Sequence, residues 1–286
     1  MMDGTIRFAF FGTPQIGVWV LDELEKEGFT PSLVVTNPDA PKGRKLTLTP
    51  SPVSLWARER NIETLKPASL KHEEVITALK DAACDLYIVA AYGKMIPREI
   101  LALPKYKVLN MHPSLLPKLR GASPIRSAIL ENMNPTGVSI MVLTEGMDEG
   151  PIVAQKEVAI REEEWPLRGR ELDELLAKKG GALLAQILPS WIEGTSEAKE
   201  QDHSQATYST KITKDMGLID LSSDPYENLL KIRAFDGWPG AYFFHQKNGQ
   251  RIRVKIIDAE IKDGELRITR VVPEGKKEMG FEEFLR

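Results

Sequence analysis

The sequence predicts an α/β fold, with a mostly parallel sheet covered by helices, followed by a smaller β domain. In the first half of the 286 residues, apolar runs alternate with segments of helical spacing, as strands and helices do in a parallel sheet. The run at 86–92 is continuously apolar, as expected of a strand that is buried on both faces. Beyond residue 240, short alternating strands are separated by Asn-Gly and Asp-Gly turns, which predicts antiparallel hairpins.

The elements of the first half follow from their local patterns. The first strand, 6–12, is apolar throughout, and the helix after it places apolar residues at helical spacing and ends at Gly28. The later elements are recognised in the same way, and we expect strands at 32–37, 86–92, 107–112, 137–143 and 151–160 and helices at 67–83, 96–101 and 167–192.

These elements predict two domains. Residues 1–192 should form the parallel-sheet domain. Residues 193–206 are polar and lack periodicity, as a linker would. Residues 207–286 should form a small β domain, which we expect to be a barrel resembling an oligonucleotide-binding fold.

Composition excludes several classes of protein. No run approaches the ~20 apolar residues of a membrane span, and the N-terminus lacks the pattern of a signal peptide. The single cysteine, Cys84, excludes an internal disulfide, and the four histidines show no metal-ligand spacing. We therefore expect a cytoplasmic protein without a metal, and a monomer. The net charge of −3 does not by itself indicate nucleic-acid binding.

The turn after the first strand, Phe-Phe-Gly-Thr-Pro, resembles the opening of a mononucleotide-binding, Rossmann-like fold. It lacks the dinucleotide fingerprint G-x-G-x-x-G, because it has only Gly12 and Gly17. A dinucleotide-dependent oxidoreductase is therefore disfavoured.

Three polar residues form the candidate catalytic site. Asn110 lies at the end of a predicted parallel strand and His112 follows two residues later, so both side chains lie on one face. Asp148 lies in the acidic turn Glu-Gly-Met-Asp-Glu-Gly. An amide donor, an imidazole and a carboxylate can together stabilise an oxyanion and transfer a proton, as acyl transfer to an amine requires. The alternatives are a structural histidine and a carboxylate that only caps the turn.

The segments NMHPSLLPKLRG and TGVSIMVLTEGMDEG resemble the core of the folate-dependent formyltransferases, and AAYGKMIP resembles their folate-binding strand end. The resemblance implies that Asn110, His112 and Asp148 are catalytic and that 10-formyltetrahydrofolate is the formyl donor. It also implies folate contacts from the two matching segments, at Ser114, Leu115, Leu116, Pro117, Tyr92, Lys94, Met95 and Ile96.

Further segments resemble the branch of that family that formylates methionine on initiator tRNA. They are FFGTP, NPDAPKGRKLTLTPSPV, IRAFDGWPGAY and PEGKKEM. The resemblance implies initiator methionyl-tRNA as partner, contacted by a basic loop with Lys42, Arg44 and Lys45. This loop continues with Leu-Thr-Leu-Thr where the family usually has another basic residue. Arg251 and Arg253 should share one face of a strand, either as a phosphate contact or as an ordinary polar outer face.

Other functions remain open at this point. A formyltransferase acting on a nucleotide-linked amino sugar would share the three catalytic residues but lack the tRNA-branch segments. A hydrolase could use the same residues to release formate from the folate. A non-catalytic folate- or RNA-binding paralogue would not need an acid–base histidine. The final location of the formyl group distinguishes these functions.

Overall fold

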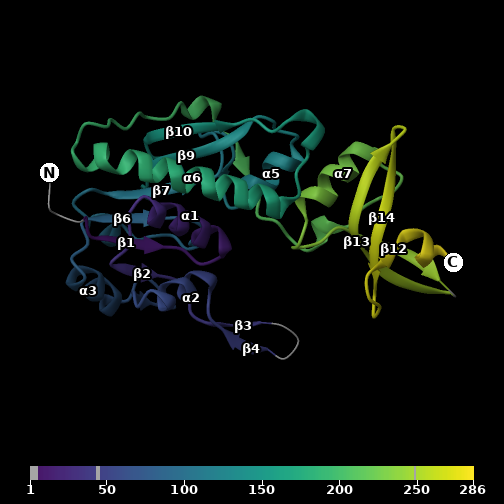
Figure 1. Cartoon of the computed structure of the whole chain (residues 1–286), viewed down its shortest axis with the longest axis horizontal. Helices are drawn as coiled ribbons and strands as arrows, with labels where there is room; N and C mark the ends of the chain where they lie inside the picture. The colour runs from purple at the N-terminus through teal and green to yellow at the C-terminus, as the bar shows by residue number, and fades with distance from the viewer. Residues whose placement is uncertain (1–5, 43–45, 248) are drawn as a thin grey trace. The chain divides into compact units, whose positions relative to one another are not determined.

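The computed structural model describes residues 6–42, 46–247 and 249–286. The chain divides into two compact units (Figure 1). The first unit comprises the chain up to residue 121 together with 137–158 and 174–208, and the second comprises 122–136, 159–173 and 209–286. The predicted boundaries at residues 192 and 207 stay a prediction.

A seven-stranded sheet forms the centre of the first unit, in the order β10-β9-β7-β6-β1-β2-β5 (Figure 1). The strands β1, β2, β5, β6 and β7 pair in parallel, and β9 runs antiparallel to β7. This confirms the predicted mostly parallel sheet. The strands are β1 (Phe8–Phe11), β2 (Leu33–Val35), β5 (Glu63–Leu65), β6 (Leu86–Val89), β7 (Val108–His112), β9 (Thr136–Val142) and β10 (Ile152–Val158).

Helices cover both faces of this sheet. On one face, α6 packs so closely that a Cβ at Gly180 would lie 2.6 Å from Met111 of β7, and one at Gly181 would lie 2.8 Å from Glu23 of α1. On the other face, α3 and α4 enclose a core that includes Tyr87 and Val89. The helices of this unit are α1 (Gln15–Lys26), α2 (Pro52–Glu59), α3 (Glu73–Asp81), α4 (Arg98–Leu101) and, from Glu174 on, α6 (Gly169–Ile192), with a 3-10 helix, η2 (His203–Gln205).

Short strands complete the first unit. A hairpin of β3 (Ala40–Lys42) and β4 (Thr47–Thr49) extends from the body of the unit (Figure 1). Neither this hairpin nor β5 was predicted from the sequence, because these three-residue strands, unlike β2, have no apolar run to mark them. Strand β8 (Arg120–Gly121) follows β7, and β11 (Tyr208–Ser209) lies where the chain passes into the second unit.

The second unit contains the predicted β domain. Its antiparallel sheet has the order β12-β13-β14-β15, with β12 (Tyr242–Lys247), β13 (Gln250–Lys262), β14 (Glu265–Pro273) and β15 (Met279–Gly280). Leu218 also bridges to Tyr242 of β12, so the antiparallel sheet of the predicted small β domain is present, and its closure into a barrel stays a prediction. The remaining elements are α5 (Pro124–Leu130), α7 (Pro225–Ala234), α8 (Phe281–Leu285), η1 (Glu162–Glu164) and η3 (Asp215–Gly217).

Most of the predicted linker packs within the first unit. We call residues 199–207, which extend one residue beyond that linker, the strap. The backbone of Lys199 exchanges two hydrogen bonds with Ile152, at 2.7 and 2.8 Å, and the side chain of Gln201 is buried. None of the helices in the described ranges is long and apolar enough to cross a membrane.

Candidate active site

The candidate site lies at the carboxyl end of β7. Asn110 and His112 alternate with Met111 along this strand, and both are almost fully buried, at 8% and 4% exposure. In the parallel pairing of β6 with β7, Val89 lies opposite Asn110. Ligands of open α/β sheets bind beyond the carboxyl ends of the parallel strands. Asn110 and His112 therefore lie where a ligand site is expected.

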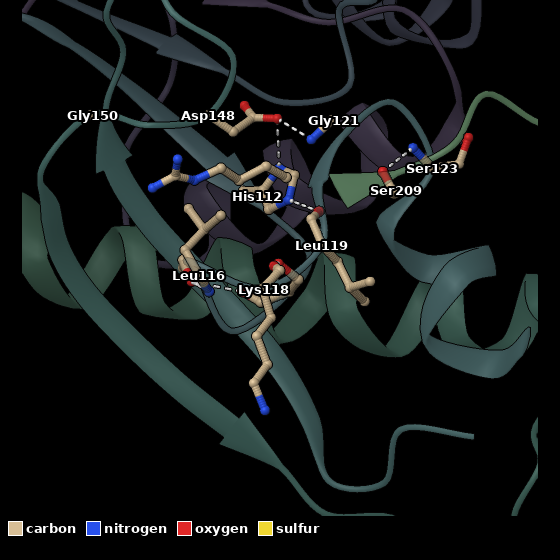
Figure 2. Close-up of polar contacts among 12 residues, drawn as sticks. His112, Leu116, Lys118, Leu119, Gly121, Ser123, Asp148, Gly150 and Ser209 are labelled. Carbon is tan, nitrogen blue, oxygen red and sulfur yellow. Dashed lines mark hydrogen bonds and ion pairs between the residues drawn. The ribbon is translucent and has the colours of Figure 1, made fainter. Parts of the chain in front are cut away.

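The imidazole of His112 has two different partners (Figure 2). Its Nε2 lies 2.9 Å from the backbone carbonyl oxygen of Leu119. A carbonyl oxygen can only accept, so Nε2 carries a proton and donates it. The other ring nitrogen, Nδ1, faces the Oδ2 atom of Asp148 at 3.6 Å. The proton that His112 can gain or lose is therefore the proton on Nδ1, next to the carboxylate.

The carboxylate of Asp148 is also held by a backbone group. Its Oδ2 atom accepts a hydrogen bond from the backbone N–H of Gly121 at 2.7 Å (Figure 2). The Asp148 backbone has a φ of 49°, in the left-handed region that aspartate tolerates better than most residues. The side chain of Asp148 is 16% exposed and that of His112 is 5% exposed. A substrate can therefore reach this pair from the Asp148 side.

The amide of Asn110 is available to a ligand. Among the described residues, no hydrogen bond involves the side chain of Asn110, although that side chain is buried. A buried amide normally finds partners, so its two N–H groups and its oxygen can bind a substrate. The structure thus brings His112 and Asp148 into contact, with Asn110 two residues before His112 on the same face of β7.

The Ser-Leu-Leu-Pro loop after β7 is fixed by its own hydrogen bonds. Ser114 Oγ donates to the carbonyl of Lys118 at 2.6 Å. The N–H of Leu116 donates to Ser139 Oγ at 3.0 Å, and Gln155 donates to the Leu116 carbonyl at 2.8 Å. Ser114 and Leu116 are buried, whereas Leu115 and Pro117 are half-buried. The loop therefore offers a ligand its shape and apolar surface rather than the Ser114 hydroxyl.

The segment 92–96 presents few side chains to a ligand. The Tyr92 ring packs edge-on against Phe11, and burial raises the pKa of its hydroxyl to about 12. Ile96 is also buried in the core. Lys94 donates to the carbonyls of Pro67 and Ala68 at 2.8 and 3.0 Å, and desolvation lowers its pKa. Met95 is 67% exposed and is the one predicted folate contact here whose side chain stands in solvent.

The predicted tRNA contacts of the first unit belong to the hairpin. Lys42 ends β3, but its side chain, like the whole of Arg44 and Lys45, lies outside the described residues. Leu46, just before β4, and Leu48, within it, are 70% and 68% exposed. These two exposed leucines stand in the segment where the resemblance led us to expect another basic residue.

The predicted arginines of the second unit lie on one face of β13, as their spacing indicated. The guanidinium of Arg251 stacks on the Phe244 ring at 3.8 Å, and that of Arg253 stacks on the Tyr242 ring at 3.7 Å. Both arginines are exposed. Within the described ranges, neither guanidinium forms an ion pair with a carboxylate.

The sequence analysis missed three groups that support the site. The carbonyl of Leu119 and the N–H of Gly121 are backbone atoms, so residue type gave no signal for them. Gln201 belongs to a polar segment that we interpreted as a linker, yet it donates to the carbonyls of Asp148 and Gly150 at 2.9 and 2.7 Å. A glutamine in a polar run carries no periodic signal.

The chain matches known proteins over most of its length. Residues 6–186 match the formyl transferase family, and residues 211–265 match its C-terminal domain. A methionyl-tRNA formyltransferase of Thermus thermophilus is 41% identical over 271 residues, which cover 94% of this chain and 86% of that protein.

Two solved structures share the fold. A methionyl-tRNA formyltransferase from Clostridium thermocellum has a TM-score of 0.62 at 17% identity, over 94% of this chain and 98% of that one. An N-formyltransferase from Helicobacter canadensis, solved with folinic acid and dTDP-3-aminofucose, has a TM-score of 0.62 at 21% identity, over 92% and 95% of the two chains. The two family matches together cover most of this chain, and the chain therefore belongs to the formyl transferase family.

Proposed function

We propose that this chain transfers the formyl group of 10-formyltetrahydrofolate to the α-amino group of methionine on initiator methionyl-tRNA, for translation initiation. One observation supports the chemistry above all. His112 is held between the Leu119 carbonyl and the Asp148 carboxylate, beside the unbonded amide of Asn110. The 41% identity to a protein named methionyl-tRNA formyltransferase supports the acceptor.

The reaction begins when the amino nitrogen attacks the formyl carbon and negative charge develops on the formyl oxygen. Two donors of the site can stabilise that oxygen, namely the side-chain N–H of Asn110 and, when the imidazole is protonated, the Nδ1–H of His112. Preorganised donors of this kind are the largest source of catalysis in acyl transfer. The Nε2–H of His112 is engaged by Leu119, so Nδ1 is the ring atom that acts.

Proton transfer completes the reaction. The attacking nitrogen loses a proton, the bond between the formyl carbon and the folate nitrogen breaks, and that nitrogen gains a proton. Nδ1 of His112 and the carboxylate of Asp148 lie 3.6 Å apart, longer than a hydrogen bond. Either group can accept the amine proton without first giving up a bond to the other. An imidazole can both accept and donate a proton, which suits transfer in both directions.

The folate would lie against the Ser-Leu-Leu-Pro loop and the segment 92–96. We propose that Leu115, Pro117 and Met95 supply apolar surface, since Met95 is exposed and the other two side chains are partly exposed. The remaining predicted contacts, at Tyr92, Lys94, Ile96, Ser114 and Leu116, would act by holding the backbone in shape. A loop that is rigid before binding loses little entropy when its ligand binds.

The tRNA would be contacted by the hairpin β3–β4, with Lys42, Arg44 and Lys45, and by Arg251 and Arg253 of the second unit. Stacking on Phe244 and Tyr242 holds each guanidinium by its face and leaves the edge N–H groups free. Those edges suit bidentate binding of a phosphate. A monomeric state and a cytoplasmic location remain part of this proposal.

One experiment tests the proposed function. The protein is incubated with 10-formyltetrahydrofolate labelled in the formyl group, and with either initiator methionyl-tRNA, uncharged tRNA, or a nucleotide-linked amino sugar. We expect label on the methionine α-amino group and on nothing else. Label on the sugar would indicate the other formyltransferase activity, and free formate in all samples would indicate a hydrolase. Unchanged donor throughout would support a non-catalytic paralogue.

A further inference from the structure

We propose that Gln201 is a positioning residue for formyl transfer, which holds the Asp148 turn so that the carboxylate faces His112. The proposal rests on the proposed function for its reaction, although the contact that it invokes is independent of the acceptor. Gln201 lies 53 residues from Asp148 in sequence, within the strap.

The amide of Gln201 is fully bonded. Its Oε1 accepts from Arg120 Nε at 3.1 Å and from Arg120 Nη2 at 2.7 Å. Its Nε2 donates to the carbonyls of Asp148 and Gly150 at 2.9 and 2.7 Å. A guanidinium only donates and a carbonyl only accepts, so the partners determine which end of the amide is which. The side chain is 5% exposed, and water competes little for these bonds.

The turn that Gln201 holds has an unusual backbone. Asp148 has a φ of 49°, in the left-handed region that few residues with a side chain adopt, although aspartate is among those that do. A Cβ at Gly150 would lie 2.0 Å from the Val142 carbonyl oxygen, so no side chain can brace the turn at that position. The two hydrogen bonds from Gln201 therefore hold the backbone on either side of Glu149.

The same contacts connect the turn to the partner of its carboxylate. Arg120 is 1% exposed and directly precedes Gly121, whose N–H binds Asp148 Oδ2. Asp148 is therefore connected to residues 120–121 in two ways. Its carbonyl is linked to Arg120 through Gln201, and its carboxylate accepts a hydrogen bond directly from Gly121. Arg120 also contacts Nδ1 of His203 at 3.2 Å, within the strap.

The strap supports His112 as well. Thr207 Oγ1 accepts from the N–H of Leu119, and the Thr207 carbonyl accepts from the N–H of Arg120, both at 2.9 Å. Leu119 in turn accepts the Nε2 proton of His112. The strap, most of which has the sequence pattern of a linker, thus holds both His112 and Asp148 in place. The distance between these two groups determines the proton transfer.

The variant Gln201→Glu separates this role from a general effect on folding. Glutamate still accepts from Arg120 and gains an ion pair with it. Its carboxylate, however, cannot donate to the carbonyls of Asp148 and Gly150 and repels them. A displacement of about 1 Å at a reacting group can cost about 100-fold in rate. We expect kcat to fall at least about tenfold, while KM for the folate changes less than about twofold, because the folate-contact segments are untouched.

Gln205→Ala is the matched control. Gln205 is an exposed glutamine of the same strap, and its one side-chain hydrogen bond to a described residue is with Ser204, at 3.5 Å. We expect it to keep the unaltered kcat. If Gln201→Glu does not fold, Gln201→Asn replaces it, because the shorter side chain cannot reach both carbonyls and Arg120 together.

Hydrogen exchange measured by mass spectrometry gives a second readout that needs no acceptor. In Gln201→Glu, amides at 146–150 should exchange faster than in the unaltered protein, and those of Gln205→Ala should not. Unchanged exchange, or an unchanged kcat in a folded Gln201→Glu protein, would overturn the positioning role. If the unaltered protein does not formylate methionyl-tRNA, the proposed function fails, and the exchange rates still decide whether Gln201 holds the turn.

Discussion

Replacing Asp148 by asparagine should remove the charge next to His112 while leaving the turn intact. The asparagine oxygen can still accept the hydrogen bond that Gly121 donates to Asp148. Asparagine also tolerates the left-handed backbone of this position, where φ is 49°. The substitution therefore tests the carboxylate itself and not the shape of the turn.

The size of the effect follows from the distance between the two groups. Opposite unit charges 3.6 Å apart attract by about 4–5 kcal/mol at an effective dielectric constant of about 20, and by about 1 kcal/mol in bulk water. The Asp148 side chain is 16% exposed, so the true value lies between these limits. Because each 1.4 kcal/mol is about a factor of ten in rate, we expect a loss of about 100-fold within a range of about 10- to 1,000-fold.

Single-turnover formyl transfer, measured by rapid quench with the enzyme in excess over methionyl-tRNA, isolates the chemical step. Folate binding, followed by fluorescence titration, should not change. Glu149→Gln is the matched control, since it removes one negative charge from the adjacent exposed residue. A single-turnover rate within about threefold of the unaltered protein, well below the general acid–base range, would refute the catalytic role of Asp148.

Three further predictions address other parts of the chain. Asn110→Ala should lower kcat by about 10²- to 10³-fold, as loss of an oxyanion donor does, with unchanged folate affinity; an equal loss in affinity and rate would instead indicate a binding role. Arg253→Ala should weaken tRNA binding and lower the slope of log K against log salt by about one, whereas Arg270→Ala, a control whose side chain already pairs with a carboxylate, should leave the slope unchanged in a filter-binding titration. Tyr92→Phe should raise the free energy of unfolding by about 1 kcal/mol, because a buried hydroxyl without a partner among the described residues is costly; urea denaturation showing a loss of stability would reveal a partner for that hydroxyl.

Much of the fold could be predicted from local pattern. The continuous apolar run at 86–92 became the central strand β6, and the alternating strands after residue 240 became β12, β13 and β14. A strand that is buried on both faces has a continuous apolar run, and a strand that is buried on one face alternates apolar and polar residues. The sheet of the second unit was expected to close into a barrel, and closure stays a prediction because it depends on pairing between strands that are distant in sequence, which no local pattern encodes.

The strand period was enough to place Asn110 and His112 on one face of β7. Period two is a property of the extended backbone itself, so it holds before any tertiary contact is made. The family resemblance added Asp148 as their partner, and the structure brings its Oδ2 atom to 3.6 Å from the imidazole. The sequence by itself thus determined the fold class and the chemical groups of the site.

Tertiary structure alone decided how those groups are held. The tautomer of His112 depends on a backbone carbonyl at Leu119, and the orientation of Asp148 depends on a backbone N–H at Gly121. Every residue has such atoms, so residue type cannot indicate which of them will act. The role of Gln201 depends on a contact with Arg120 across 81 residues of sequence. Such contacts form only when the folded chain brings distant segments together and excludes the water that would otherwise satisfy them.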